Sequence, residues 1–247
     1  MKQLLVLLAF ALAARPLQAA SSHQPSLVAR LFASQANSSS YLGKSAGIEA
    51  EYRDGENLAF GLGYETFGRT FLAGPDITDR IGTFTLSYDL QGGRYFELSA
   101  ARAPDAQIRP LTSVQLTPHL AADKSDFSLG FGWNHYREMD AGLLRPSYMY
   151  FFSDQLRAAI AIPVLRTNQT LVAEQFSVTD AFTDLHSLRF DVAGGRTLED
   201  AGLQADFNTL SVEYGYRFLS LTIFGSVGTY WSTSRTEQNY GLRMELR

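Results

Sequence analysis

The sequence has no cysteine, and only three of its 247 residues are lysine. An exported chain with this composition has to keep its shape without disulfide bonds. Nearly all of the basic residues are arginine, whose planar guanidinium pairs well with carboxylates, phosphates and sugar phosphates. The formal net charge is −4. Because this balance is acidic, we do not expect nucleic acid to be a partner.

Long apolar runs are also missing. Beyond the N-terminal segment, no stretch of about 18 apolar residues is present, so no transmembrane helix is predicted. The N-terminal segment has Lys2, an apolar run at residues 4–14 and then small residues, which is the layout of a secretory signal peptide. We therefore predict a cleaved signal peptide at 1–20, with its cut within 19–22, and a single mature domain at 21–247.

Two glycine-rich stretches lack residues that a nucleotide site requires. In "NLAFGLGYETFG", residues 57–68, the third glycine of a dinucleotide fingerprint would fall at Thr66. In "SSSYLGKSAG", residues 38–47, the leading glycine of a phosphate loop would fall at Ser38, and no apolar strand precedes it. We expect no nucleotide at either place.

The histidines and carboxylates show no catalytic or metal-ligating spacing. His23 follows the predicted signal peptide, whereas His119, His135 and His186 lie on or near predicted strands without a recognised partner spacing. The spacing of a calcium loop is missing too. We predict that the protein is not an enzyme and has no catalytic residue, metal or cofactor, although a triad assembled across strands stays open.

What the sequence does contain is a strong alternation with a period of two from Ser26 onward. Within residues 57–68, every second residue is apolar and the residues between them are small or charged. The stretch "DFSLGFGWNHY" at 126–136 repeats the pattern. Such alternation is typical of antiparallel strands with one apolar face. It predicts an all-β chain of about fourteen strands, with twelve as the alternative.

The predicted segments are close to the ~9 to 11 residues that a tilted strand needs to cross a membrane. Odd-numbered connections are mostly the longer ones and even-numbered connections are mostly tight, as expected for a transmembrane up-and-down antiparallel barrel with both termini at the short-turn side. The predicted strands are 26–35, 43–53, 57–67, 78–90, 94–103, 112–120, 126–136, 142–152, 155–166, 170–179, 184–193, 206–217, 219–231 and 237–247.

Aromatic residues on the apolar face gather near the predicted strand ends, and aliphatic residues fill the middle. Aromatic girdles flanking an aliphatic band are typical of a transmembrane barrel. A soluble β-sandwich with one wet face is the alternative, but it does not explain these end positions. The predicted girdle residues are Tyr52, Tyr64, Tyr88, Trp133, Phe152, Phe218, Trp231 and Tyr240.

The opposite face carries glycine and ionisable residues, which would line the inside of a barrel. Unpaired burial of these charges in a dry core would be very costly, whereas in a lumen they meet water and one another. Acidic and basic residues nearly balance, which predicts a narrow, water-filled passage with little net ion preference. Arginines there would pair with carboxylates or contact an acidic or hydroxylated ligand. The predicted lumen-lining residues are Glu49, Glu51, Gly61, Gly63, Glu65, Glu97, Gly130, Gly132, Arg145, Arg157, Arg189, Asp191, Glu213, Arg217, Arg243 and Glu245, and the same alternation adds Arg30, Asp89 and Arg247.

The order of "GIEAEYRDGENLAFGLGYETFG", "DFSLGFGWNHY", "SVEYGYRF" and "NYGLRMELR" resembles the YaiO family of bacterial outer-membrane β-barrels over nearly the whole mature chain. The resemblance implies an outer-membrane location in a Gram-negative cell, where the partners are lipid, lipopolysaccharide and the barrel insertion machinery. It also implies an association with surface-polysaccharide machinery, and it supplies no catalytic residues. The ending at Leu246 and Arg247 replaces the aromatic residue usual in such barrels, which we interpret as a weak insertion signal.

The predicted function is a narrow passive pore or conduit of the outer membrane, associated with polysaccharide export. One alternative is a non-conducting structural or accessory barrel of an envelope assembly. A less favoured alternative is a membrane enzyme that modifies lipid or lipopolysaccharide. That enzyme requires a histidine or serine cluster at one membrane edge, so a wide separation of His119, His135 and His186 would count against it.

Overall fold

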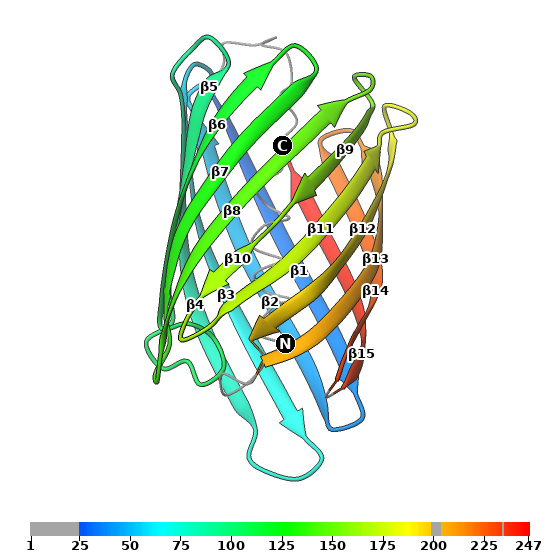
Figure 1. The fold of residues 1–247 in the computed structure, drawn as a ribbon. Helices are drawn as coiled ribbons and strands as arrows, with labels where there is room; N and C mark the ends of the chain where they lie inside the picture. Colours follow the sequence, from blue (N-terminus) through cyan, green and yellow to red (C-terminus); the bar gives the residue numbers. More distant parts are fainter. Residues whose placement is uncertain (1–24, 199–203, 234) are drawn as a thin grey trace.

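The computed structural model describes residues 25–198, 204–233 and 235–247. In these ranges the chain is all-β and closes into an antiparallel barrel of fourteen strand positions (Figure 1). No helix in the same ranges is long and apolar enough to cross a membrane. The predicted signal peptide at 1–20 lies outside the described residues. The fold class predicted from alternation is therefore confirmed.

Except at one interrupted strand position, each strand pairs with its neighbours in sequence, and the first strand pairs with the last. The strands are β1 (Ser26–Ser38), β2 (Tyr41–Arg53), β3 (Leu58–Phe71), β4 (Ile77–Asp89), β5 (Arg94–Arg102), β6 (Thr112–Ala122), β7 (Ser125–His135), β8 (Asp140–Phe151), β9 (Leu156–Ala161), β10 (Val164–Arg166), β11 (Thr170–Asp180), β12 (His186–Leu198), β13 (Gln204–Phe218), β14 (Leu221–Ser232) and β15 (Thr236–Leu246).

The strands β9 and β10 are two pieces of one strand position between β8 and β11. The interruption falls at Ile162 and Pro163, and proline has no N–H with which to continue a hydrogen-bonded ladder. Around the break, the Ile162 N–H donates to the Pro146 carbonyl at 3.0 Å, and the Ala173 N–H donates to the Pro163 carbonyl at 3.0 Å. The predicted strand 155–166 is thus present but interrupted.

The two ends of the barrel differ in how the strands are joined. At the terminal end, β1 begins, β15 ends, and tight turns such as 123–124 and 219–220 connect the strands. At the opposite end, which we call the far end, the predicted long connections are mostly additional strand. The β1–β2 link consists of residues 39 and 40 alone, and only the segment 103–111 is a long described loop.

An apolar cluster inside the far end explains why these polar sequences form strands and not loops. Ala36, Tyr41, Phe67 and Ile108 are buried together, and the neighbouring aromatic Phe71 packs against them. Within 36–42 polar outward residues hide the apolar–polar alternation from view in the sequence. The inward residues nevertheless form a small apolar core at this end of the barrel. The regular difference in length between odd and even connections that we predicted is therefore largely absent.

Exposed apolar side chains form a band around the outside of the barrel. Leu27, Leu62, Val227 and Leu246 are each more than half exposed. An apolar surface of this extent is unfavourable in water and favours contact with lipid. We call this surface the apolar band. Of the predicted girdle residues, Tyr52 is half-buried and the other seven are exposed.

The apolar band predicts a depth-dependent response to charge on one strand. Replacing Leu62, at the middle of the band on β3, by arginine should destabilise the barrel in lipid vesicles by about 2–4 kcal/mol. The same change at Thr66, which faces outward nearer the far end, should cost less than about 1 kcal/mol. Urea unfolding of both variants in vesicles measures the difference, and equal costs would contradict this position of the band.

Candidate functional site: the charged inner face

The strand register places the predicted lumen-lining residues on the face opposite the apolar band. Residues directly opposite each other in an antiparallel pair share a face of the sheet. Glu49 is opposite Gly63, Glu51 is opposite Gly61 and Arg189 is opposite Glu213. The same pairing runs around the barrel and joins these residues to Glu97, Gly130, Gly132, Arg145, Arg157, Asp191, Arg217, Arg243 and Glu245.

The most buried charges lie where the first and last strands meet. The guanidinium of Arg30 on β1 donates to Glu49 at 3.2 Å, to Glu51 at 3.1 Å and to Glu245 on β15 at 3.1 Å. All four residues are less than 10% exposed. Arg247 adds a second cation beside Glu245 at 2.5 Å. This network joins β15, β1 and β2 from inside, and loss of its central arginine would leave three carboxylates buried together.

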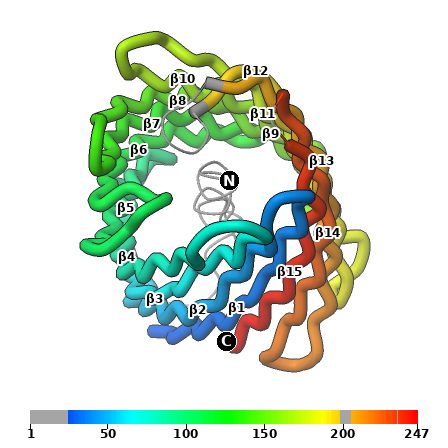
Figure 2. The backbone as a smooth tube through the Cα atoms, turned by 90° about the horizontal axis from the view of Figure 1, so that it is seen from below, coloured from blue at the N-terminus to red at the C-terminus, as the bar shows by residue number. Residues whose placement is uncertain are grey.

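The loop 103–111 folds onto the inner face near the far end (Figure 2). Asp79 on β4, which is fully buried, accepts hydrogen bonds from the backbone N–H groups of Gln107, Ile108 and Arg109 at 2.8, 3.1 and 3.0 Å. These bonds bind the loop backbone to the barrel wall. Ile108 reaches the apolar cluster formed with β1, β2 and β3. The loop therefore narrows the interior of the barrel at this end.

Arg109 holds the same loop through its side chain. It donates two hydrogen bonds to Glu65, at 3.0 and 3.2 Å, and its guanidinium lies 4.5 Å from the centre of the Phe67 ring. Burial lowers the pKa of Arg109 to about 10, while Glu65 opposes this shift, so the group stays charged at neutral pH. The alternation pattern missed Arg109 and Asp79 as a pair because they lie thirty residues apart.

A second cluster of polar residues lies on the inner face of β5, β6 and β7. His119 Nδ1 is 3.1 Å from an Asp126 carboxylate oxygen, and its Nε2 is 3.7 Å from Glu97. Tyr95 stacks on the His119 ring with centroids 4.1 Å apart and donates its hydroxyl to Asp126. The arrangement has two carboxylates around one imidazole. No group of residues able to hold a metal ion occurs within the described ranges.

The inner wall from β8 to β13 is richer in arginine. Arg145 donates to Gln175 at 3.0 Å, and Arg189 forms a two-pronged pair with Asp191 at 2.8–3.0 Å. The Arg189 guanidinium is close enough to those of Arg145 and Arg157 to repel both. Within the described ranges, Arg157 makes no hydrogen bond or ion pair. This wall therefore carries positive charge that its own carboxylates do not cancel.

Farther round the same wall, Arg243 pairs with Glu213 at 3.0 Å and lies over the Phe224 ring at 4.0 Å. Arg217 faces inward on β13, and in the described part of the chain it has no hydrogen-bonded partner. The wall from β2 to β7 instead carries Glu49, Glu51, Glu65, Asp79, Asp89, Glu97 and Asp126. The same wall also holds Arg53 and Arg69, and the loop residue Arg109 lies against it. Carboxylates still outnumber arginines there, whereas the described inward arginines outnumber the carboxylates from β8 to β13.

The inward glycines have a local steric reason for being small. A Cβ atom added at Gly61 would lie 2.6 Å from Thr85 Oγ1, and one at Gly63 would clash with Thr83 Oγ1. Gly130 and Gly132 are less confined, with nearest atoms at 3.2 and 3.3 Å. Gly61 and Gly63 therefore make room for threonines on β4, whereas Gly130 could accept a side chain after a small shift.

The described histidines do not form the cluster that a lipid-modifying enzyme would require. His119 faces inward on β6. His135, at the far end of β7, contacts Asp140 and Trp133, and His186, at the terminal end of β12, contacts Tyr214. These contacts place the three rings in separate surroundings.

Comparison with solved structures supports the barrel fold. The translocator domain of the autotransporter NalP from Neisseria meningitidis matches with a TM-score of 0.52 and 9% identity, covering 99% of this chain and 94% of that one. A variant of the Rh. blastica porin matches with a TM-score of 0.51 and 11% identity, covering 90% and 100%. The chain has the fold of an outer-membrane β-barrel.

Sequence comparison does not assign this chain to a family. No family model matches the chain, and no curated protein matches it. The resemblance to the YaiO family therefore stays a prediction. At such low identities, the matching structures establish the arrangement of strands and leave activity to be argued from the residues of this chain.

The contacts of Asp79 predict that its charge holds the inner loop. Replacing Asp79 by asparagine keeps the size of the side chain but weakens three hydrogen bonds, so the amides of 107–109 should exchange hydrogen at least about tenfold faster. Hydrogen exchange followed by mass spectrometry measures this. The change Asp105→Asn, at an exposed position of the same loop, should leave the exchange rate unchanged. Equal protection in the wild type and the Asp79 variant would refute the role of Asp79.

Proposed function

We propose that this protein lies in the outer membrane of a Gram-negative cell and forms a narrow passive pore. The outward apolar band supports insertion into lipid, and the charged inner face supports a water-filled interior. A barrel of eight strands is filled by its own side chains, whereas one of about 16 to 18 leaves a channel. Fourteen strand positions lie between these limits.

The observation that carries the proposal is that inward charges remain partly open to solvent. The side chains of Arg189 and Asp191 are 19% and 18% exposed, and those of Arg243 and Glu213 are 23% and 27% exposed. Charged groups in a closed, dry interior would be paired and fully buried. Their partial exposure supports a hydrated passage along the inner face of β12–β15.

The separation of charge across the interior sharpens the expected selectivity. An acidic wall opposite a basic wall produces a field across the passage, which orients solutes carrying both signs of charge or many hydroxyl groups. We therefore favour small zwitterionic or glycan-like solutes over simple ions. The link to polysaccharide export, together with the polysaccharide-secretion proteins and the insertion machinery as partners, rests on the YaiO resemblance and is part of the proposal.

One observation favours the second candidate, a non-conducting accessory barrel of an envelope assembly. Loop 103–111 is held inside by Asp79 and by the Arg109–Glu65 pair. If this loop closes the passage permanently, the barrel carries no current and serves as a docking partner. The two candidates differ in conductance, which can be measured directly.

Planar bilayers containing the purified protein should show discrete conductance steps. The Arg157→Gln, Arg189→Gln double variant removes two inward cations, so the ratio of cation to anion permeability should rise severalfold.

Replacing Glu65 by glutamine should weaken the ion pair that holds loop 103–111 and so raise the conductance. Arg166→Gln, on the outward face of β10, is the matched control and should change neither quantity.

A membrane that stays closed at every voltage, with the wild type and with the Glu65 variant alike, would overturn the pore and leave the accessory barrel. A ratio of cation to anion permeability that is unchanged in the double arginine variant would show that β8–β13 does not line the passage.

A further inference from the structure

Basic residues mark the edge of the apolar band on one side of the outer surface. Lys44 on β2, Arg80 on β4 and Arg102 on β5 face outward and are exposed. Each is the first charged outward residue met on its strand beyond the apolar band in the direction of the far end. The outward residues that precede them are Ala50, Ile48 and Ala46 on β2, Leu86, Phe84 and Gly82 on β4, and Leu98 and Ala100 on β5.

These three side chains occupy three successive hydrogen-bonded rows, each one row nearer the terminal end than the last. Lys44 shares a row with Gln35, Arg80 shares the next row with Thr66, and Arg102 shares the row after that with Thr112. Strands of a membrane barrel tilt by about 35–45° from its axis, so positions of equal height lie in successive rows from one strand to the next. The polar residues of these rows therefore lie along one edge of the apolar band.

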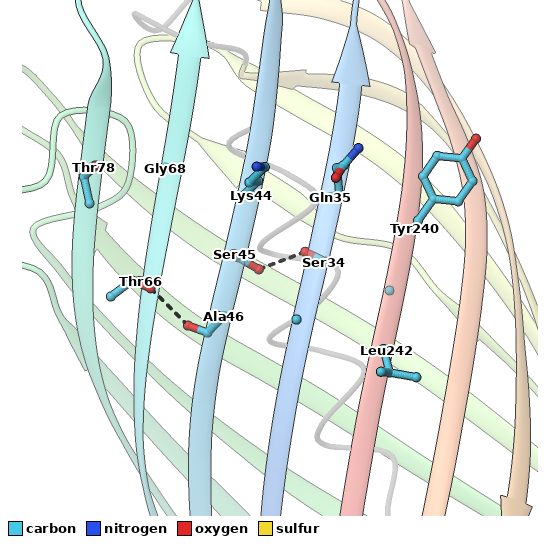
Figure 3. Close-up of a pocket in the computed structure, with 12 residues that line it drawn as sticks. Ser34, Gln35, Lys44, Ser45, Ala46, Thr66, Gly68, Thr78, Tyr240 and Leu242 are labelled. Carbon is cyan, nitrogen blue, oxygen red and sulfur yellow. Dashed lines mark hydrogen bonds between the residues drawn. The ribbon is translucent and has the colours of Figure 1, made fainter.

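A hollow in the outer surface lies beside Lys44 (Figure 3). It has a volume of about 630 Å³ and lies over β15 and β1 to β4. The small residues Ala33, Ala46 and Gly68 line it together with the aromatic Tyr240. Lys44, Gln35, Thr66 and Thr78 offer polar groups around it. The hollow therefore combines apolar walls with hydrogen-bonding groups.

The positive charge on this side is not balanced by the protein. The outward residues described on β1 to β5 include no carboxylate, and within the described ranges Lys44, Arg80 and Arg102 form no ion pair. On the opposite side of the barrel, the outward Arg196 is paired with Asp206 at 3.1 Å. Arg166 on β10 is also outward, but it hydrogen-bonds Thr170 at 2.5 Å, and the outward carboxylate Glu174 lies on the neighbouring strand β11. Among the described strands, the β2–β5 side thus gathers three outward cations at the edge of the apolar band with no outward carboxylate beside them.

We propose that this face binds the phosphorylated headgroup of a glycolipid in the outer leaflet. The phosphates would meet Lys44, Arg80 and Arg102, because guanidinium and ammonium groups bind phosphate oxygens by charge-assisted hydrogen bonds. The sugar hydroxyls would meet Gln35, Thr66 and Thr78 in the hollow, and the acyl chains would continue along the apolar band. The inference rests on the proposed insertion into the outer membrane and does not depend on whether the interior conducts.

The test uses the purified barrel in neutral detergent micelles, with diphosphorylated lipid A and its dephosphorylated form as probes. Native mass spectrometry, titrated with each probe, gives the apparent dissociation constants. Removal of one surface cation should weaken binding of the phosphorylated probe about fivefold, and the triple variant Lys44→Gln, Arg80→Gln, Arg102→Gln about 100-fold. The double variant Arg166→Gln, Arg196→Gln is the control, and its affinity should match the wild type.

Folding of every variant is checked first by the different gel migration of boiled and unboiled samples. If even the wild type shows no migration shift and no insertion into vesicles, both the membrane proposal and this inference fall. If the proteins fold and insert, but the triple variant binds like the wild type or the dephosphorylated probe binds equally well, the glycolipid site alone is wrong. Competition by inorganic phosphate at equal concentration would identify a general anion site and overturn the glycolipid assignment.

Discussion

The structure depends on the closure of the sheet between β1 and β15. An open sheet of this length would leave one row of backbone N–H and C=O groups without partners at each edge, which is unfavourable in lipid. Ten residue pairs join the two strands, from Ala29 with Leu246 to Ser38 with Glu237. Arg30 reinforces this seam from inside by binding carboxylates on both β2 and β15.

Closure also decides where charge is tolerated. Once the sheet is a cylinder, alternation sends every second side chain into a shared interior, where arginines and carboxylates from distant strands meet. The pair between Arg243 and Glu213 and the hold of Glu65 on Arg109 both arise in this way. Outside, the same alternation leaves a continuous apolar band, and the few outward cations lie at its edge.

The interior is neither packed solid nor a plain tube. Loop 103–111 occupies part of the far end and is bound by a buried aspartate, while the charges on β12 to β15 keep some contact with solvent. The acidic and basic walls lie on different sides. This combination is what the proposed function builds on, both for a selective passage and for the non-conducting alternative.

The sequence alone predicted the fold class and the number of strand positions, because a period of two is a local property of extended backbone. The residues of β3 show this, since the alternation of Leu62 with Gly61 and Gly63 can be recognised without knowing which strands pair with β3.

The sequence could not predict which charges meet. Arg30 contacts Glu245 across 215 residues of sequence, and this contact exists only after closure sets the register. The inward fold of 103–111 was hidden for the same reason, because Asp79 and the loop come together only in the tertiary structure. The polar far-end segments became strands because inward residues such as Tyr41 and Phe67 found a shared core there. Local alternation therefore determined the wall of the barrel, and long-range pairing decided what fills it and what its surfaces offer to a ligand.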